Sequence, residues 1–522
     1  MSNSNKLVKK KLPRVMFAGT NSGCGKTSIV CGILWALKCM GVSCSSVKCG
    51  PDYIDPMFHS QIFGIPSQNI DMFFCNSKQN LYLMSENAKD TDITVMEGVM
   101  GYFDGLAMDS VVASSYDVAY NTNTPVVLIV NAKGMGLSVV SVIEGFLKFD
   151  TNGNSSDKTN CKCVKNNCIK GVILNNISSM TGNMLSKVIE ERTGIKVLGC
   201  VPNISDCHFE TRHLGLVTPF EQEDIKKTIE KIGHIIKENV DINAIIELAN
   251  SAVDVEVDMP NEWKKYIDDD ILKEQSCNNS ISEFDLQNSN YDVNLGRQVS
   301  GEIVNNKKEK HLLNVALAWD NAFCFYYKDN IELLKKLGCR INTFSPIKDK
   351  VLPKDTDIIL LGGGYPEVYG EQLSQNKAML NSIKNAIESG VYCLAECGGF
   401  MYLHEQLECE NGKVYNMVGV IKGKSFNTKH LVRFGYISIK DINSDNTLIK
   451  GHEFHYWDST NNGSSFVAVK PSGKRSWECI HAAKNYIVGY PHLYYYSNIE
   501  FISNFLESCR NSKLHDKFIA DE

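Results

Sequence analysis

One short glycine-rich segment near the start of the chain restricts its fold more than any other feature. Gly19-Thr20-Asn21-Ser22-Gly23-Cys24-Gly25-Lys26-Thr27 separates an apolar run at residues 14–18 from a helical apolar pattern at residues 26–40. A turn of this kind, between a strand and a helix, directs backbone N–H groups and the positive end of the helix dipole at an anion. The segment therefore predicts a phosphate-binding loop at the carboxyl end of a strand.

The loop departs at one position from the pattern G-x-x-x-x-G-K-[ST]. Thr20 stands where the pattern has glycine, and Gly19 comes one position early. In such loops the lysine, here Lys26, reaches the β- and γ-phosphates, and the next hydroxyl, here of Thr27, binds Mg²⁺. The alternative is a glycine-rich turn with a lysine by chance. The loop residues for which we predict ATP binding are Thr20, Ser22, Gly23, Cys24, Gly25, Lys26 and Thr27.

One amide and three carboxylates follow strands that we expect beside this loop. Asn175 comes directly after a strand-like run, where it either binds a purine edge of ATP or caps the next helix. Asp52 follows the second strand and Glu97 a strand at 93–96, and an acid after a buried strand points into the ligand cleft. We predict that both bind Mg²⁺, whereas capping a turn or helix is the alternative. Asp104 is equally well an ordinary turn residue.

Apolar periodicity predicts two α/β units joined by a linker. Strand-like runs alternate with helical patterns in both halves of the chain, which is typical of parallel sheets covered by helices on both faces. The intervening stretch is rich in asparagine and poor in apolar residues, as expected of a linker. We place an ATP-binding domain at 13–245, the linker at 246–311 and a second domain at 312–505.

A cysteine in the second unit has the setting of a nucleophile. Cys397 lies in Leu394-Ala395-Glu396-Cys397-Gly398-Gly399-Phe400, between a strand and a helix. A turn of small residues lifts the central side chain out of the sheet, and the start of a helix lowers the pKa of a thiol. Cys393 lies inside the strand, and we expect it to be a buried structural thiol.

A thiolate nucleophile also needs oxyanion donors and a base. A second glycine-rich turn, Gly362-Gly363-Gly364-Tyr365-Pro366-Glu367, follows another strand and could present N–H groups. The donors that we predict are the backbone amides of Gly363, Gly364 and Gly398. For each histidine considered as the base, the alternative is a structural histidine whose ring nitrogens are already hydrogen-bonded. The candidate bases are His492, His452 and His455, among which sequence spacing does not choose.

Composition excludes several other classes of protein. The chain has 522 residues, a formal net charge of -6 and 43% hydrophobic residues, which argues against wholesale disorder and against a nucleic-acid partner. No apolar run approaches the ~18–20 residues of a membrane span, and no signal-peptide pattern follows the N-terminal lysines. We therefore expect a cytoplasmic protein without a membrane partner, which could form oligomers.

The cysteine content points the same way. Nineteen cysteines, an odd number, argue for reduced thiols rather than a disulfide framework. Cys161, Cys163 and Cys168 cluster in a polar stretch, but no second ligand pair completes a metal knuckle. We interpret this stretch as a loop insertion.

Taken together, the two sites resemble those of a known family. From about residue 13 to residue 497 the chain is similar to the cobyrinic acid a,c-diamide synthases, which are glutamine-dependent amidotransferases of the corrin pathway. The early glycine of the phosphate loop is also the form found in the related dethiobiotin synthetases. The most specific marks are residues 50–56 with Phe58 and His59, and residues 212–216, 320–327, 362–367, 396–403 and 452–456.

This resemblance implies a fold and a two-step chemistry. The implied fold is α/β, with a dethiobiotin synthetase-like P-loop domain followed by a class I glutamine amidotransferase-like domain. In the first domain, ATP with Mg²⁺ would phosphorylate a carboxylate of cobyrinic acid to an acyl phosphate. In the second, a cysteine would attack L-glutamine and release ammonia, which displaces the phosphate inside the protein. The cycle would run on the a and c acetate side chains.

The resemblance also implies roles for individual residues. Cys397 would be the nucleophile and His492 its base. Many glutaminases carry a glutamate two residues after the base, but here that position is Tyr494, so a Cys–His dyad oriented by a tyrosine or a backbone carbonyl is implied. Lys26 and Thr27 would bind nucleotide and metal, and Asp52 and Glu97 would bind the metal. The residues implied to lie near the corrinoid carboxylates are Tyr53, Asp55 and Asp104.

Other functions remain open from the sequence alone. Hydrogenobyrinic acid or nickel-sirohydrochlorin could replace cobyrinic acid in the same chemistry. Cobyric acid synthases share both domain types, but we expect them to lack the segment at 50–56. An ATP-driven switch with a degenerate glutaminase module is a further class, although the cysteine and the phosphate loop are both intact. A cysteine hydrolase fused to a nucleotide-sensing domain is the last alternative.

Overall fold

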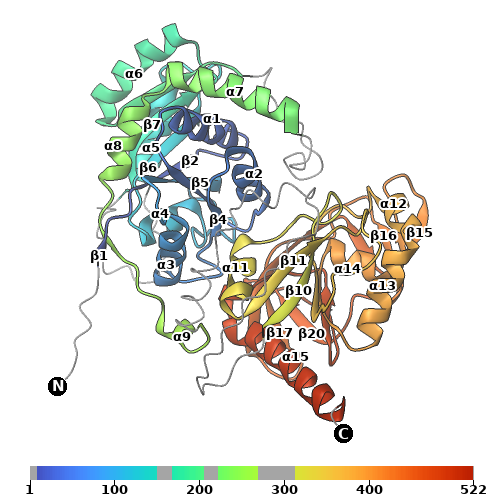
Figure 1. Ribbon diagram of the computed structural model, residues 1–522. Coiled ribbons are helices and arrows are strands. Elements are labelled where there is room, and N and C mark those ends of the chain that lie inside the picture. Colours follow the sequence, from blue (N-terminus) through green and yellow to red (C-terminus); the bar gives the residue numbers. More distant parts are fainter. Residues whose placement is uncertain (1–8, 150–166, 205–221, 268–311, 521–522) are drawn as a thin grey trace, which may run out of the picture.

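Two α/β units, each built on its own sheet, lie side by side in the structure (Figure 1). This computed structural model describes residues 9–149, 167–204, 222–267 and 312–520. The first unit is coloured blue to green and the second yellow to red in Figure 1. The predicted alternation of strands and helices is confirmed in both halves.

The sheet of the first unit is entirely parallel, with the strand order β4-β3-β5-β2-β6-β7-β8. Its central strands are buried on both faces, which is why they appear in the sequence as continuous apolar runs. From β2 the chain first adds the strands toward one edge of the sheet and later those toward the other edge. The carboxyl end of β2 therefore lies at a switch point, where α/β proteins bind ligands. The strands are β2 (Arg14–Gly19), β3 (Cys44–Cys49), β4 (Ser67–Ile70), β5 (Ile93–Gly101), β6 (Val126–Asn131), β7 (Ile169–Asn175) and β8 (Lys196–Val201).

Helices cover this sheet, and α7 also packs along α1 (Figure 1). Gly233 permits that packing, because a Cβ there would collide with the ring of Trp35. Arg14 is fully buried and donates to the carbonyls of Leu12, Thr122 and Val253, which ties the segment after α8 to β2. The helices are α1 (Lys26–Cys39), α2 (Ile54–Phe63), α3 (Ser77–Asn87), α4 (Ser115–Asn121), α5 (Ser138–Lys148), α6 (Ser179–Thr193), α7 (Gln222–Asn239), α8 (Ile242–Asn250) and α9 (Asn261–Lys264).

The second unit combines a largely parallel sheet with two smaller sheets. The largest has the order β11-β10-β12-β13-β23-β22, in which only the pairing of β22 with β23 is antiparallel among the described strands. Its strands are β10 (Leu313–Ala318), β11 (Cys339–Phe344), β12 (Ile358–Leu361), β13 (Tyr392–Glu396), β22 (His481–Ala482) and β23 (Tyr486–Gly489).

The two smaller sheets have the orders β21-β20-β17-β18-β24 and β15-β14-β16-β19. The first contains β17 (Arg433–Asp441), β18 (Thr447–His455), β20 (Phe466–Val469), β21 (Ser476–Cys479) and β24 (His492–Tyr494). The second contains β14 (His404–Glu408), β15 (Val414–Asn416), β16 (Ile421–Asn427) and β19 (Trp457–Ser459). The helical segments are α11 (Lys328–Lys336), α12 (Gly370–Gln375), α13 (Lys377–Glu388), α14 (Gly398–Leu403), η2 (Tyr495–Ser497) and α15 (Ile499–Ala520).

Aromatic rings and a few polar contacts hold the two units together. Phe74 stacks on Tyr494 with ring centroids 4.8 Å apart. The Tyr436 hydroxyl donates to Asp71 Oδ2 at 2.5 Å, and Lys450 Nζ donates to a carbonyl of the first unit at 2.7 Å. The region after β3 and β4 of the first unit is therefore packed directly against the second.

Two predictions about the chain's organisation differ from the structure. We ended the strand before Glu97, but β5 continues to Gly101, because backbone pairing continues through a register shift after the apolar run has ended. Residues 246–267, which we placed in the linker, contain the end of α8, then β9 (Val255–Glu256) and then α9. Strand β9 pairs with β1 (Lys9–Lys10). The domain limits themselves stay predictions.

Several sequence features lie outside the described residues. They are Cys161 and Cys163, the segment at 212–216 and the linker from 268 to 311. Cys168, directly before β7, is described, and its carbonyl accepts from the amide of Val126 at the start of β6. No helix in the described part of the chain is both long and apolar enough to cross a bilayer.

Candidate active sites

The glycine-rich segment connects β2 to α1, as predicted. Gly23 and Gly25 have φ values of 76° and 96°, in the left-handed region that glycine enters without a Cβ clash. A Cβ on Gly25 would also collide with the amide of Asn175. That amide donates to the Cys24 carbonyl at 2.8 Å, so β7 fixes the shape of the loop.

Asn175 does not cap the following helix, so that alternative is wrong. Ser178 is the residue that caps α6, through its side-chain oxygen. The Oδ1 atom of Asn175 is buried and has no hydrogen-bond partner among the described residues. Asn175 thus supports the loop backbone, and its contact with ATP stays a prediction.

Lys26 and Thr27, at the start of α1, both contact β5. Lys26 Nζ donates to the carbonyls of Met100 at 2.6 Å and Asn21 at 3.2 Å, and burial lowers the pKa of its ammonium group. The Thr27 hydroxyl donates to Glu97 Oε1 at 2.7 Å. The hydroxyl and the carboxylate predicted to bind Mg²⁺ therefore lie together, although Glu97 is inside a strand rather than after one.

Sequence reasoning missed the residue that organises this site, Lys48. Its ammonium is buried at the end of β3 and pairs with Asp55 and, at 2.8 Å, with Glu97 Oε1. Burial alone would lower the pKa of Lys48, but the two carboxylates raise it well above its usual value. A lysine in a strand that is otherwise apolar or small, two residues before Gly50, was the signal that could have revealed it.

The carboxylates around Lys48 differ in their protonation. Burial favours the neutral form of Asp55, but Lys48 outweighs it and lowers the pKa of that carboxyl. Burial raises the pKa of Glu97, with Lys48 opposing it. Burial and the neighbouring Asp55 raise the pKa of Asp52 to about 7. The site is therefore able to hold or release a proton at Asp52 near neutral pH.

Asp104 behaves as a turn residue in the structure. Its Oδ2 accepts from the Gly101 amide at 2.9 Å, and the side chain is exposed. A Cβ on Gly101 would meet both Asp104 and the Thr20 carbonyl, so this turn lies next to the phosphate loop. Its predicted role toward a substrate stays a prediction.

Mg²⁺ fits the residues around Thr27. Glu97 Oε2 is buried and has no hydrogen-bond partner among the described residues, so one carboxylate oxygen is available as a ligand. No group of three or more His, Cys, Asp or Glu side chains in the described part of the chain is arranged to hold a metal. Mg²⁺ usually binds through one or two carboxylates together with substrate phosphates and water, so it needs no such group.

The thiol site is built at the end of β13. Cys397 has φ 48° and ψ -104°, a strained conformation for a residue with a Cβ, and α14 begins directly after it. The Gly398 amide donates to the thiol, yet burial dominates and raises the pKa of Cys397. Cys393, four residues earlier and inside β13, is fully buried. Cys397 is thus held at an elbow but stays a protonated thiol in this arrangement.

The second glycine-rich turn lies against this elbow. Gly364 N would be 3.0 Å from a Cβ on Gly398, and the Gly363 carbonyl accepts from the amides of Cys324 and Phe325 at 3.1 Å. Gly363 also forms an antiparallel bridge with Phe325. The turn is therefore held close to Gly398 beside the thiol, and the role of its N–H groups toward an oxyanion stays a prediction.

His492, the first residue of β24, lies closest to this turn among the three candidate histidines. It is 2% exposed, and a Cβ on Gly363 would be 2.5 Å from its Cε1. Its Nδ1 faces Glu396 Oε2 at 3.7 Å, and Glu396 Oε1 accepts from the Leu493 amide at 3.3 Å. Glu396, directly before the cysteine, is therefore the candidate for the group that orients His492, which sequence reasoning did not identify.

The other two histidines are occupied elsewhere. His455 bonds to the Trp457 carbonyl at 2.6 Å and to Glu453 at 3.0 Å, and it stacks on Tyr490. His452 bonds to the Tyr327 hydroxyl at 2.9 Å and stacks on His492 with centroids 5.0 Å apart. His455 has partners at both ring nitrogens and His452 has one at Nδ1, but His455 also lines the cavity at Cys397, so the assignment of His492 as the base stays a prediction.

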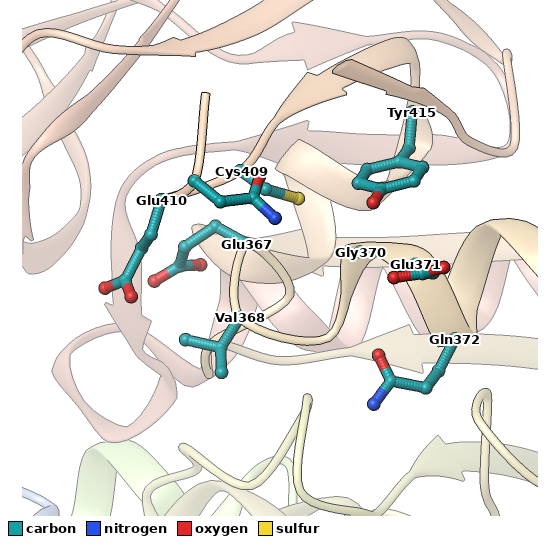
Figure 2. A pocket seen from close by; sticks show the side chains of 9 residues that line it. Glu367, Val368, Gly370, Glu371, Gln372, Cys409, Glu410 and Tyr415 are labelled. Carbon is teal, nitrogen blue, oxygen red and sulfur yellow. The ribbon is translucent and has the colours of Figure 1, made fainter. Parts of the chain in front are cut away.

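Two cavities share Glu367, and the inner one lies at the thiol. The inner one, about 50 Å³, is lined by Tyr53, Phe325, Gly364 and Cys397. The outer one, about 290 Å³, is shown in Figure 2, where the carboxyl groups of Glu367 and Glu410 lie at the same end. Burial raises the pKa of Glu367, which lines both cavities, to about 8.

Comparison with known proteins decides the family. Residues 314–498 match the model of a CobB/CobQ-like glutamine amidotransferase domain, and residues 13–211 match that of an AAA domain. The cobyrinate a,c-diamide synthase of Caldanaerobacter subterraneus subsp. tengcongensis is 34% identical over 503 residues, which cover 95% of this chain and 98% of that protein. The chain belongs to the cobyrinate a,c-diamide synthase family.

Further relatives agree with this assignment. The cobyrinate a,c-diamide synthase of Clostridium tetani is 35% identical over 94% of this chain and 99% of its own length. That of Fusobacterium nucleatum subsp. nucleatum is 35% identical over 93% of this chain and 98% of its own length. As a member of the cobyrinate a,c-diamide synthase family the protein is an enzyme, a ligase that forms C–N bonds with glutamine as the amido donor. The resemblance inferred from the sequence is confirmed.

Replacement of Lys48 by methionine is expected to lower ATP-dependent amidation at least ~100-fold, because it leaves two buried carboxylates without their counterion. Lys424→Met is the matched control, since it breaks a lysine–glutamate pair at 3.0 Å far from the phosphate loop. Equal amidation rates for the two variants, measured by product formation from ammonia, would contradict a central role for Lys48.

Gly363→Ala is expected to reduce glutamine hydrolysis about 100-fold, since the new Cβ would displace His492, and misplacement of a catalytic group by ~1 Å has effects of that size. Synthesis from added ammonia should persist. Gly145→Ala, in α5, is the control because a Cβ there meets nothing within 4 Å. Glutaminase activity in Gly363→Ala equal to that of the control would rule out this geometry for the base.

Proposed function

We propose that the protein converts the a and c acetate carboxylates of cobyrinic acid to carboxamides, using ATP and L-glutamine, as a step in cobalamin biosynthesis. Family membership supports glutamine-dependent amidation. The observation that carries the finer proposal is the presence of two sites, one with a phosphate loop and buried carboxylates, the other with a strained cysteine next to a glycine-rich turn that packs on a histidine. Tyr53, from the first unit, lines the cavity of the second site.

The first half-reaction is the activation of a carboxylate, which is by itself a poor acyl electrophile. A carboxylate oxygen of cobyrinic acid attacks the γ-phosphorus of ATP, and the bond from that phosphorus to the β–γ bridging oxygen breaks, which gives an acyl phosphate and ADP. Lys26 and the loop amides stabilise negative charge on the transferring phosphoryl group. Mg²⁺, held by Thr27 and Glu97, would supply further positive charge at the phosphates.

The second half-reaction supplies ammonia. Cys397 transfers its proton to His492, and its sulfur attacks the side-chain amide carbon of glutamine. Gly363, Gly364 and Gly398 donate N–H groups to the developing oxyanion. Protonation of the leaving nitrogen releases ammonia and leaves a thioester, which water hydrolyses to glutamate. Ammonia then attacks the acyl phosphate, and phosphate leaves.

Cys397→Ala should abolish glutamine-dependent amidation yet retain amidation from added ammonia, because only the source of ammonia is lost. Lys26→Ala should remove amidation from both sources. The measurement is mass spectrometry of cobyrinic acid incubated with ATP, Mg²⁺ and either nitrogen donor, with a no-ATP control. Two successive carboxyl-to-amide conversions are expected for the wild-type protein. Loss of the ammonia-driven reaction in folded Cys397→Ala would disprove the separation of the two sites.

Glu396→Gln is expected to lower kcat for glutamine hydrolysis at least ~10-fold with little change in KM, because Glu396 contacts the base rather than glutamine. Glutamine at this position keeps an oxygen for the Leu493 amide but loses the negative charge that stabilises an imidazolium. Glu396→Asp retains the charge and should keep more activity. Unchanged kcat in Glu396→Gln would show that another group orients His492.

A further inference from the structure

Tyr53 belongs to the ATP-binding unit, yet its side chain reaches into the thiol site of the other unit. It is 8% exposed, and its ring lies 5.3 Å from that of Phe325 and 5.2 Å from that of His492, measured between centroids. Its hydroxyl is 3.3 Å from His492 Nε2. This contact joins two residues that lie far apart in the sequence, and it links the sites proposed for the two reactions.

This contact occupies the ring nitrogen that thiol chemistry requires. Glu396 faces Nδ1 of His492, which leaves Nε2 to accept the proton of Cys397. If Nε2 accepts from Tyr53 its lone pair is used, and if it donates to Tyr53 it already carries a proton. In neither case is it a free base. Within the described part of the chain, moreover, no hydrogen bond joins Cys397 to His492.

Tyr53 also forms part of the wall of the thiol cavity. The inner cavity of about 50 Å³ has room for only a few water molecules. Sites for small organic ligands are typically about 300–1,000 Å³, so glutamine reaches Cys397 only when part of the wall moves. Tyr53 is the lining residue that the ATP-binding unit contributes.

The backbone that carries Tyr53 is attached to the ATP site on both sides. Asp52, the residue before it, is a predicted metal ligand, and Asp55, two residues after it, pairs with Lys48. The Asp52 carbonyl also accepts from Asn69 at 2.7 Å. A change in charge or position at the two aspartates therefore reaches Tyr53 through one or two residues.

We propose that Tyr53 is a positioning residue that keeps His492 in a resting arrangement until the ATP site is loaded, and so couples glutamine hydrolysis to amidation. Withdrawal of Tyr53 frees Nε2 of His492 for the Cys397 proton and opens the cavity to glutamine. This role rests on the proposed functions of Cys397 and His492.

The test compares glutamine hydrolysis by the full-length wild-type protein and Tyr53→Phe, with and without ATP, Mg²⁺ and cobyrinic acid. Phenylalanine keeps the ring and removes the hydroxyl. We expect the rate without ATP and cobyrinic acid to rise about 3- to 10-fold in Tyr53→Phe, the effect of one hydrogen bond, so that stimulation by these ligands falls. Alkylation of Cys397 by iodoacetamide, followed by peptide mass spectrometry, should accelerate to a similar extent.

Tyr436→Phe is the matched control, because it removes another tyrosine hydroxyl from the same interface, the one that donates to Asp71 at 2.5 Å, without contact to His492. Its unstimulated hydrolysis and alkylation rates should equal those of the wild-type protein. An unchanged or lower unstimulated rate in Tyr53→Phe would overturn the proposal, as would an equal rise in Tyr436→Phe.

Failure of the underlying function is detected separately. Amidation of cobyrinic acid by the wild-type protein from added ammonia does not require Cys397 or His492. If that reaction occurs while Tyr53→Phe behaves like the wild-type protein, the coupling role alone is disproved. If it does not occur, the proposed function itself is wrong.

Discussion

A buried ammonium group between two carboxylates holds the parts of the ATP site in position. Lys48, at the end of β3, pairs with Asp55 on α2 and with Glu97 on β5, and Glu97 in turn accepts from Thr27 at the start of α1. Removing any one charge would leave another uncompensated in a medium that solvates it poorly, at a cost of several kcal/mol. Four elements of the first unit are therefore fixed around one point, and the Asp52–Asp55 segment is fixed with them.

The thiol site depends on strain rather than on charge. Cys397 keeps a positive φ because β13 and α14 hold it from both sides, and that conformation presents its sulfur to the glycine-rich turn. Gly363 has room only for a hydrogen where His492 packs. Backbone geometry thus determines which atoms meet, while burial raises the pKa of the thiol.

Local patterns predicted much of this structure, and long-range pairings account for what they missed. The phosphate loop, the cysteine elbow and the alternation of strands and helices along the chain follow from apolar periodicity and small-residue turns, which are local. Lys48 was not predicted, because a lysine in a strand is recognisable as functional only once its two carboxylate partners are in place. Glu396 was overlooked for the same reason, since His492 lies about a hundred residues away. Residue spacing likewise could not place Tyr53 beside His492.

The aromatic character of the interface has a chemical consequence for ammonia. Tyr53, Phe325 and Tyr327 are buried, and the ring of Tyr53 contacts the other two where the units meet. A medium that solvates charge poorly favours the neutral form of a base over its cation, so in the proposed mechanism ammonia released there would stay unprotonated and nucleophilic. Bulk water would protonate it and would compete for the acyl phosphate. Buried rings where the two units meet therefore suit the proposed transfer of ammonia from one site to the other.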